Sequence, residues 1–196
     1  MEPVINQKEK FMVIEGGKKT YTTADIEALP PGERAELIDG EMFIMEAPSI
    51  THQRILGELH VQIYMHIKNK KGSCEVFISP AVYVKDDIHN YVEPDITVIC
   101  KEDKLDEKGC HGAPDWAVEI VSPSSRKMDY VRKTALYKEA GVREYWIVDP
   151  EEKLVIVNDF GHRKKEERYS FEDQIRVGIF EDLYICVSNL EVDGFR

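Results

Sequence analysis

The longest regular run of apolar positions lies between Ser49 and about Lys70 and has the spacing of a helix. Apolar side chains recur there every three or four residues, which places them on one face of a helix. The members of this stripe are Ile55, Leu56, Leu59, Ile63, Tyr64 and Ile67. The pattern predicts one long helix with the stripe buried.

Shorter apolar runs have the pattern of β-strands. Residues 75–84 alternate between apolar and less apolar positions, and residues 94–100 and 154–157 are rich in β-branched side chains. Residues 116–121 and 145–150 are almost continuously apolar, as expected of strands that are covered on both faces of a sheet. Short terminal strands are expected at the remaining apolar clusters, 169–171, 174–177 and 183–187.

Turn-forming residues divide the first quarter of the chain. Asp39 and Gly40 stand between two short apolar runs, which is a strong signal for a β-hairpin over residues 35–45. Before it, residues 22–29 read as a short helix that Thr22 or Thr23 caps and that the following Pro-Pro-Gly ends. We therefore expect a helix and then a hairpin.

A second helix is expected after the strand at 116–121. The serine-rich segment 122–125 offers an N-terminal cap, and Gly141 has the position of a C-terminal cap for a helix over about 127–140. Between the central strands, the acidic segment 101–108 is most simply a solvated loop.

These elements predict an α/β fold in a single domain over residues 1–196, with a lead-in over 1–20 and the folded domain over 21–190. The length suits one core, and the 42% of hydrophobic and 32% of charged residues are those of a globular protein. No apolar run approaches the ~20 residues that cross a bilayer. The first fifteen residues also lack the apolar core of a signal peptide, so we expect a cytoplasmic protein with no membrane partner.

Cysteine spacing and net charge constrain the function. The four cysteines, Cys74, Cys100, Cys110 and Cys186, form no C-x-x-C pair of the kind that zinc or redox sites use, so we expect reduced, mostly buried thiols. The net charge of −11 opposes nucleic-acid binding, because such binding draws its affinity from Lys and Arg. A bound divalent metal, or a dimer that gathers its basic residues along one groove, would offset this charge.

Two carboxylates stand out because of where the strands place them. Glu119 is the one charged residue of the run 116–121, and an ionised carboxylate in a buried strand is costly unless a cation compensates for its lost hydration. Asp95 begins another strand after Pro94 and can project from the sheet end towards the same space. Two carboxylates with water and phosphate oxygens suit Mg²⁺. The pair predicts phosphodiester hydrolysis.

The same residues carry a family resemblance. Pro94-Asp95 followed by Glu119-Ile120-Val121 on a strand resembles the PD-(D/E)XK nuclease superfamily, with Val121 where that motif has a lysine. From about residue 21 to 190, the chain resembles one branch of it, the Uma-two family of restriction-endonuclease-like proteins, also called domain of unknown function 820. The segments that match in order and spacing are 36–41, 52, 94–96, 119–125, 129, 133, 137 and 141–150.

The resemblance implies a restriction-endonuclease-like mixed central β-sheet flanked by helices, and a site that binds Mg²⁺ or Mn²⁺. Its metal ligands would be Asp95, Glu119 and the backbone carbonyl of Ile120. Lys133 would stand in for the missing lysine, because the helical period places it at the start of a stripe that faces the sheet. Glu36 is a further acidic candidate from the resemblance.

His52 is a weaker candidate, as a phosphate contact or proton carrier, because imidazole titrates near neutral pH. Structural alternatives stand beside each assignment. Asp95 or Glu119 can pair with Lys133 or Arg132, and Lys133 can instead face solvent. Glu36 can pair with Arg34, and His52 can be satisfied by a nearby carboxylate. Tyr137 and Trp146 read as core residues and Asp39 as a turn residue.

Three functions follow from this site. The first is a Mg²⁺- or Mn²⁺-dependent DNA endonuclease, acting as a homodimer because cutting both strands usually takes two sites related by symmetry. The second is an inactive nuclease-fold module for binding or structure, which Val121 and the acidic charge favour. The third is a hydrolase of small phosphorylated molecules.

Overall fold

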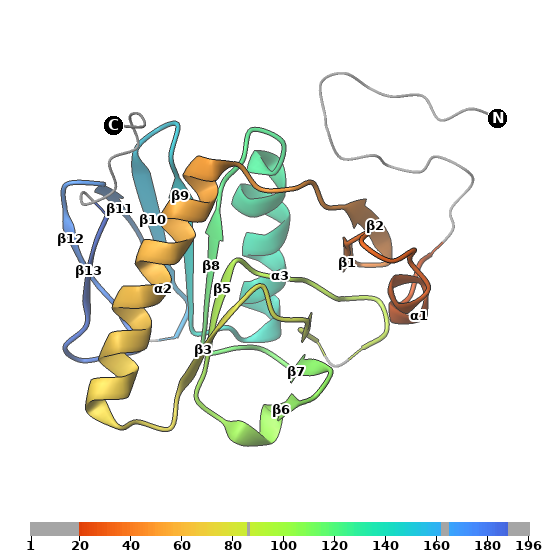
Figure 1. Ribbon diagram of the computed structural model, residues 1–196, viewed down its shortest axis with the longest axis horizontal. Coiled ribbons are helices and arrows are strands. Elements are labelled where there is room, and N and C mark those ends of the chain that lie inside the picture. The colour runs from red at the N-terminus through yellow and green to blue at the C-terminus, as the bar shows by residue number, and fades with distance from the viewer. Residues whose placement is uncertain (1–19, 86, 162–164, 188–196) are drawn as a thin grey trace.

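A six-stranded mixed sheet forms the centre of the computed structural model, which describes residues 20–85, 87–161 and 165–187. The strands lie in the order β11-β10-β9-β8-β5-β3 (Figure 1). Strands β8 and β9 are parallel, and every other neighbouring pair is antiparallel. The bounds are β3 Glu75–Ile78, β5 Ile96–Ile99, β8 Trp116–Ile120, β9 Glu144–Asp149, β10 Leu154–Asp159 and β11 Lys165–Ser170. The α/β class and the mixed central sheet expected from the sequence are confirmed.

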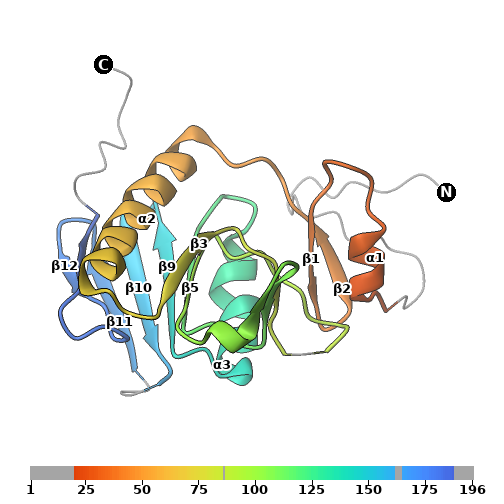
Figure 2. The ribbon, with the colours of Figure 1, turned by 60° about the horizontal axis from the view of Figure 1, so that its bottom comes forward.

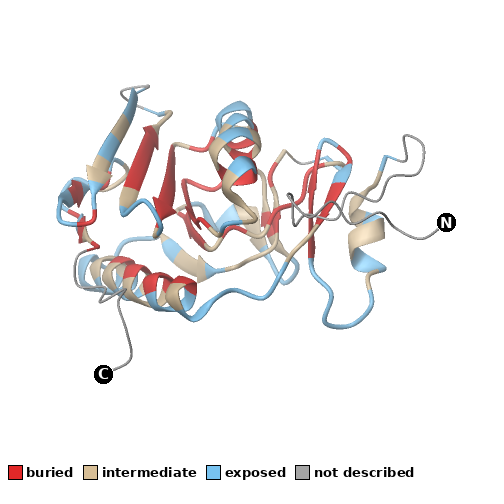
Figure 3. Ribbon diagram, turned by 90° about the horizontal axis from the view of Figure 1, so that it is seen from above, coloured by how far each residue is buried: buried red, intermediate tan, exposed pale blue. Residues whose placement is uncertain are grey.

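Helices cover both faces of this sheet (Figure 2). The long helix α2 (Ile50–Lys70) lies on one face, and the π-helical segment η2 (Met128–Lys133) with α3 (Thr134–Ala140) lies on the other. Side chains of β8 alternate between the two sides, since Val118 packs with the α2 cluster and Ala117 with the α3 cluster. Buried residues accordingly concentrate in the central strands and on the face of α2 turned towards them (Figure 3).

A second, smaller group of strands flanks the α3 side. The hairpin β1 (Ala35–Ile38) and β2 (Glu41–Ile44) joins the body through Leu37 and Tyr91, which exchange backbone hydrogen bonds of 2.6 and 2.8 Å. Val92 in turn pairs with Val82. The remaining elements are α1 Thr23–Glu27, β4 Val82–Tyr83, η1 Glu102–Lys104, β6 Leu105–Asp106, β7 Gly109–His111, β12 Gln174–Arg176 and β13 Tyr184–Cys186.

Local signals at the element ends are confirmed. Asp39 and Gly40 have φ angles of 50° and 77°, the left-handed values that a tight hairpin turn needs. Gly141 ends α3 with a φ of 90°. At α1, the Thr22 amide donates to the Asp25 carboxylate at 2.9 Å, and at α2 the Ser49 hydroxyl accepts from the His52 amide.

Three expectations about local structure are wrong in part. Tyr64 is not in the buried stripe of α2, since 45% of it is exposed and it stacks on His60 on the outer side. The helix expected over 127–140 is present but contains the π-helical segment η2 before α3. Residues 101–108 are exposed for the most part, but they form η1 and β6, because β7 returns beside them and supplies a strand partner.

The expectation of four reduced thiols is wrong for one pair, since Cys74 and Cys100 form a disulfide. They flank the ladder in which Glu75 pairs with Ile99, so strand register brings them together across 26 positions. Cys110 and Cys186 are not disulfide-bonded, and burial raises the pKa of the Cys110 thiol to about 11.

Within the described ranges, no helix is both long and apolar enough to span a bilayer. The lead-in expected over 1–20 falls almost entirely on residues outside those ranges. The domain bounds of 21–190 therefore stay a prediction.

Candidate active site

The Glu119 carboxylate lies at the centre of a buried polar cluster between β8 and the helix α3. Its Oε1 accepts a hydrogen bond from Lys133 Nζ at 2.8 Å and another from the Tyr137 hydroxyl at 2.8 Å. Both Glu119 and Lys133 have only 5% of their side chains exposed. The strand therefore presents its one charged residue to a cation that the following helix provides.

Lys133 also reaches the hairpin. Its Nζ lies 2.8 Å from Oε1 of Glu36 on β1 and 3.8 Å from Oδ1 of Asp129, one turn earlier in its own segment. The alternative in which Lys133 faces solvent is thereby excluded. One ammonium group is shared among three carboxylates from a strand, a hairpin and a helix.

Burial and mutual repulsion set the charge states of this cluster. Burial raises the pKa of Glu119 well above its ordinary value; Lys133 opposes this rise, while Asp129, Asp95 and Glu36 add to it. Burial also raises the pKa of Asp129 to about 7, against the effects of Lys133 and of its hydrogen bond from Ser125. For Lys133, burial lowers the pKa, but the surrounding carboxylates together raise it well above its usual value. Lys133 is thus a permanent cation.

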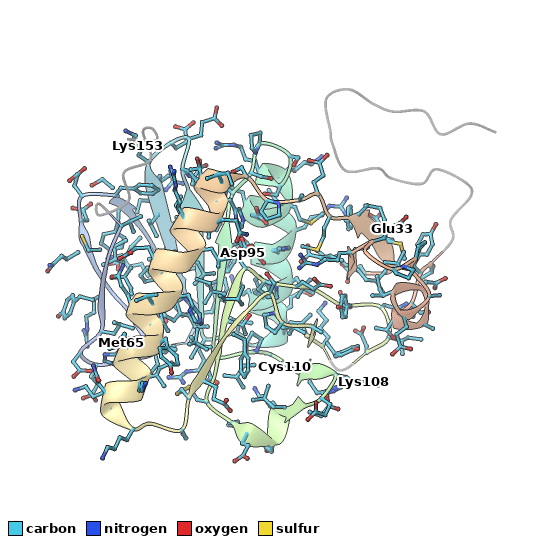
Figure 4. All side chains as sticks on the ribbon, in the orientation of Figure 1. Glu33, Met65, Asp95, Lys108, Cys110 and Lys153 are labelled. Atoms are coloured by element: carbon cyan, nitrogen blue, oxygen red, sulfur yellow. A yellow bond between two sulfur atoms is a disulfide. The ribbon has the colours of Figure 1, made fainter. Side chains whose placement is uncertain are left out.

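Asp95 lies just before β5 and borders this cluster; in Figure 4 it is labelled between α2 and α3. Its Oδ2 accepts a 2.7 Å hydrogen bond from the Ile120 amide and lies 3.0 Å from Nε2 of His52, in the first turn of α2. Ile120 follows Glu119 directly, so the two carboxylates flank the same short stretch of β8. The side chain of Asp95 is 16% exposed, which leaves it the more open of the pair.

His52 is buried, and its ring nitrogens have different surroundings. Nε2 faces Asp95, whereas Nδ1 is buried with no hydrogen-bond partner among the residues described. If Nε2 carries the proton donated to Asp95, Nδ1 holds the lone pair. The structural alternative expected for His52, a histidine near the helix N-terminus that pairs with a nearby carboxylate, is also observed, and Asp95 is that carboxylate.

The cluster has the composition of a cation site. Three carboxyl groups, those of Glu36, Glu119 and Asp129, lie around the Lys133 ammonium group and Asp95 borders them, so acidic groups outnumber the cation. A further cation bound there would favour the ionised form of the acids whose pKa values are raised. Among the residues described, no hydrogen bond falls on Oδ1 of Asp95 or Oε2 of Glu119. No described set of three or more His, Cys, Asp and Glu residues is arranged to hold a metal. Mg²⁺ needs only one or two carboxylates, so Asp95 and Glu119 meet this minimum by residue type.

The sequence analysis missed three contributors to the cluster. The sequence matches the family at Asp129 but gives it no role, and it predicts Tyr137 as a core residue and Tyr145 as part of a buried strand. Tyr137 is fully buried as expected, yet its hydroxyl also binds Glu119; the Tyr145 hydroxyl donates to the Asp129 carbonyl at 3.0 Å. The spacing of Asp129 four residues before Lys133 was the signal that could have identified it.

The other structural alternatives resolve as follows. Glu36 pairs with Lys133 and not with Arg34, because Arg34 pairs with Glu93. Arg132 pairs with Glu41 of the hairpin and not with Asp95 or Glu119. Trp146 is fully buried, in agreement with the core assignment.

Comparison with known proteins gives a family and a fold. A family model described as "Putative restriction endonuclease", Uma2, matches residues 23–185. A solved structure described as a "putative nuclease belonging to DUF820" from Anabaena variabilis is similar with a TM-score of 0.71 and 22% sequence identity; the match covers 86% of this chain and 96% of that one. A search of curated proteins gives no match.

Proposed function

Since the chain belongs to the Uma2 family, described as "Putative restriction endonuclease", we propose that it is a metal-dependent endonuclease that hydrolyses DNA phosphodiester bonds. One observation carries the proposal: Glu119 and Asp95 flank one stretch of β8, with Lys133 bound to Glu119. Paired carboxylates with a nearby lysine supply what phosphodiester hydrolysis needs, which is a site for a divalent cation and a positive charge for the phosphate.

In this proposal Asp95, Glu119 and the Ile120 carbonyl hold Mg²⁺ or Mn²⁺. The bound metal supplies Lewis-acid polarisation of the phosphate and a water of lowered pKa. Glu36 completes the site from the hairpin by holding Lys133 Nζ at 2.8 Å. Lys133 has three N–H donors, of which two lie against Glu36 and Glu119. In this proposal the third, which has only Asp129 at 3.8 Å, donates to a phosphate oxygen.

His52 has two tasks in the proposed mechanism. Through Nε2 it fixes the orientation of the Asp95 carboxylate, in the way that partners of metal-binding carboxylates usually do. Through Nδ1 it can accept the proton of the attacking water once substrate opens the buried ring to that water.

The test is cleavage of supercoiled plasmid by the purified chain with Mg²⁺ or Mn²⁺, against the same reaction with EDTA. We expect metal-dependent nicking or linearisation, lost by roughly 100-fold or more in Asp95→Asn and Glu119→Gln, because each removes an anionic ligand of the metal that would stabilise the charge of the transition state. Asp103→Asn, in the exposed segment η1, is the matched control and should cut normally. Intact plasmid under every condition, with no Mn²⁺ binding by calorimetry, rejects the proposal.

An inactive nuclease-fold module is the second candidate. Two observations favour it: Val121 stands where the superfamily has its lysine, and Lys133 already occupies one oxygen of Glu119. DNA binding without cutting, with the affinity unchanged in Asp95→Asn, would support this version.

The homodimer belongs to the endonuclease proposal, because two symmetry-related sites would cut both strands. Light scattering on the purified chain tests it. A mass close to the 22.6 kDa of a single chain, at concentrations where plasmid is linearised, contradicts it.

A further inference from the structure

A hollow of about 310 Å³ lies beside the hairpin, on the side of α1. Its volume is at the lower end of the ~300–1,000 Å³ that small-molecule pockets span. Its walls come from α1, β1, β4 and the segment 91–93, and none of its lining residues belongs to the Glu119 cluster. The residues used below are Arg34, Tyr83, Tyr91 and Glu93, with Glu27 and Lys108.

A guanidinium group is fixed in the wall of this pocket. Arg34 Nε donates to Oε2 of Glu93 at 2.6 Å, and Nη2 pairs with the same oxygen. The other oxygen of Glu93 accepts from the Tyr91 hydroxyl at 2.8 Å. Burial and Glu93 raise the pKa of Tyr91, so this hydroxyl keeps its proton. Glu93 therefore holds Arg34 by one edge.

The other edge of that guanidinium is available. In the part of the chain that the structure describes, no hydrogen bond or ion pair falls on Nη1 of Arg34. The Arg34 side chain is 44% exposed, whereas that of Glu93 is 11% exposed. Nη1 and the second hydrogen of Nη2 thus form a pre-oriented fork of two donors, and such a fork matches a pair of acceptors on a planar ligand.

The rest of the pocket suits a flat, uncharged ring. Tyr83 and Tyr91 meet edge to face with centroids 5.4 Å apart, and Tyr83 stacks in parallel on His111. At the rim, Lys108 is paired with Glu27 at 3.2 Å. The cations of the pocket are therefore both neutralised by carboxylates, which disfavours a phosphate group but not a nucleobase.

The pocket is connected to the candidate active site along two segments. The Glu93 amide donates to Oε1 of Glu36 at 2.9 Å, the same oxygen that contacts Lys133. Glu93 is also two residues before Asp95, and two residues of extended chain span roughly 7 Å. A nucleotide whose phosphate lies at Asp95 would have a neighbouring base within reach of Arg34.

We propose that this pocket holds one unpaired base of the substrate strand, with a preference for guanine, and that Arg34 is the residue that reads it. Guanine presents two acceptors, O6 and N7, to a two-donor fork, and arginine is the usual partner for that edge. Tyr83 and Tyr91, which both line the pocket, provide its aromatic wall. The inference rests on the proposed nuclease function for its substrate, DNA, and it adds a base-specificity site that is separate from the metal site.

The test measures binding by fluorescence anisotropy in an Asp95→Asn background, so that cutting does not interfere. The probes are fluorescein-labelled single strands of eleven thymidines whose central residue is either kept as thymidine or replaced by dG, dA, dC or an abasic site. We expect the dG strand to bind roughly 5- to 100-fold more tightly than the others, the discrimination of one good bidentate contact. Adding Arg34→Gln or Arg34→Lys should abolish this preference, because neither residue offers the planar fork.

Arg168→Gln is the matched control, because Arg168 is an exposed arginine paired with Glu166 on the edge strand β11. It should keep the preference for dG. Tyr83→Ala is a second probe and should weaken all four base-containing strands, including the all-thymidine one, relative to the abasic strand. Equal affinity for all the strands, or a dG preference that survives Arg34→Gln, overturns the inference.

The plasmid assay separates this inference from the proposed function. A chain that prefers dG through Arg34 but never cuts DNA would refute the nuclease and keep the base-reading site. A chain that cuts plasmid in a metal-dependent way but shows no preference among the probes would support the nuclease and refute the base-reading site.

Discussion

Lys133 Nζ lies 2.8 Å from Oε1 of Glu119, although the two residues belong to different layers of the fold and are 14 positions apart. The same nitrogen is 2.8 Å from Oε1 of Glu36. One buried ammonium group therefore compensates carboxylates from the sheet and from the hairpin. The stability of the cluster and the chemistry proposed for it depend on the same atom.

Replacing Lys133 by methionine should destabilise the metal-free chain by about 3–5 kcal/mol, because it leaves buried carboxylates without their cation. Urea unfolding in the presence of EDTA measures the change. Mn²⁺ should recover part of the loss, since a bound metal compensates the same charges. Lys138→Met, at an exposed position of α3, is the control and should change little. An unfolding free energy in Lys133→Met equal to that of the parent chain would contradict the assignment.

His52→Ala should lower Mn²⁺ affinity by roughly 10- to 100-fold, because Asp95 loses the partner that orients it. Calorimetric titration with Mn²⁺ gives the affinity directly. His60→Ala, on the outer side of the same helix, provides the comparison, and its affinity should match that of the parent chain. If both variants bind Mn²⁺ as the parent does, His52 has no part in the site.

Asp129 should contribute less to the free energy of unfolding of the metal-free chain as the pH rises from about 4 to about 7. Burial raises the pKa of Asp129 to about 7 from 3.8, so across this window the folded chain holds a proton that the unfolded chain has released. Asp129→Asn should flatten this slope, because the amide does not titrate. Urea unfolding with EDTA at about pH 5 and about pH 8 tests it, with Asp103→Asn as control. If the unfolding free energy depends on pH equally in Asp129→Asn and Asp103→Asn, the pKa of Asp129 is not raised.

Cys74→Ser should lower the free energy of unfolding by about 3 kcal/mol, the loop-closure contribution of a disulfide that spans 26 positions. Cys186→Ser should have a smaller effect, because Cys186 forms no disulfide. Thiol titration of the denatured, unreduced chain checks the premise independently. Two reactive thiols are expected, and four would show that the bond is absent.

Much of the architecture could be predicted because its causes are local. The Asp39-Gly40 turn needs only two residues that accept left-handed φ values, and the α2 stripe needs only its own spacing. Glu119 could be identified because a charge inside an apolar run is conspicuous without knowledge of its neighbours. Tyr64 was misplaced because the spacing alone does not define the edge of the buried stripe.

The contacts that define the site depend on register and layer, which the sequence does not display. Cys74 meets Cys100 only because β3 and β5 pair in one particular register. Tyr137 could be assigned to the interior from its period, but its hydroxyl partner depends on which strand lies beneath α3. The ion pair between Glu36 and Lys133 likewise forms only because the hairpin folds back over the α3 side of the sheet.

The link between Glu36 and Lys133 also bears on synthesis of the chain. A nascent chain that has emerged only as far as β8 carries Glu36 and Glu119 but not Lys133, the cation that pairs with both. Closing the hairpin over the sheet at that stage would bury the two carboxyl groups without a cation between them, which is unfavourable. A chain that ends before Lys133 therefore lacks the ion pairs that join the hairpin to the sheet.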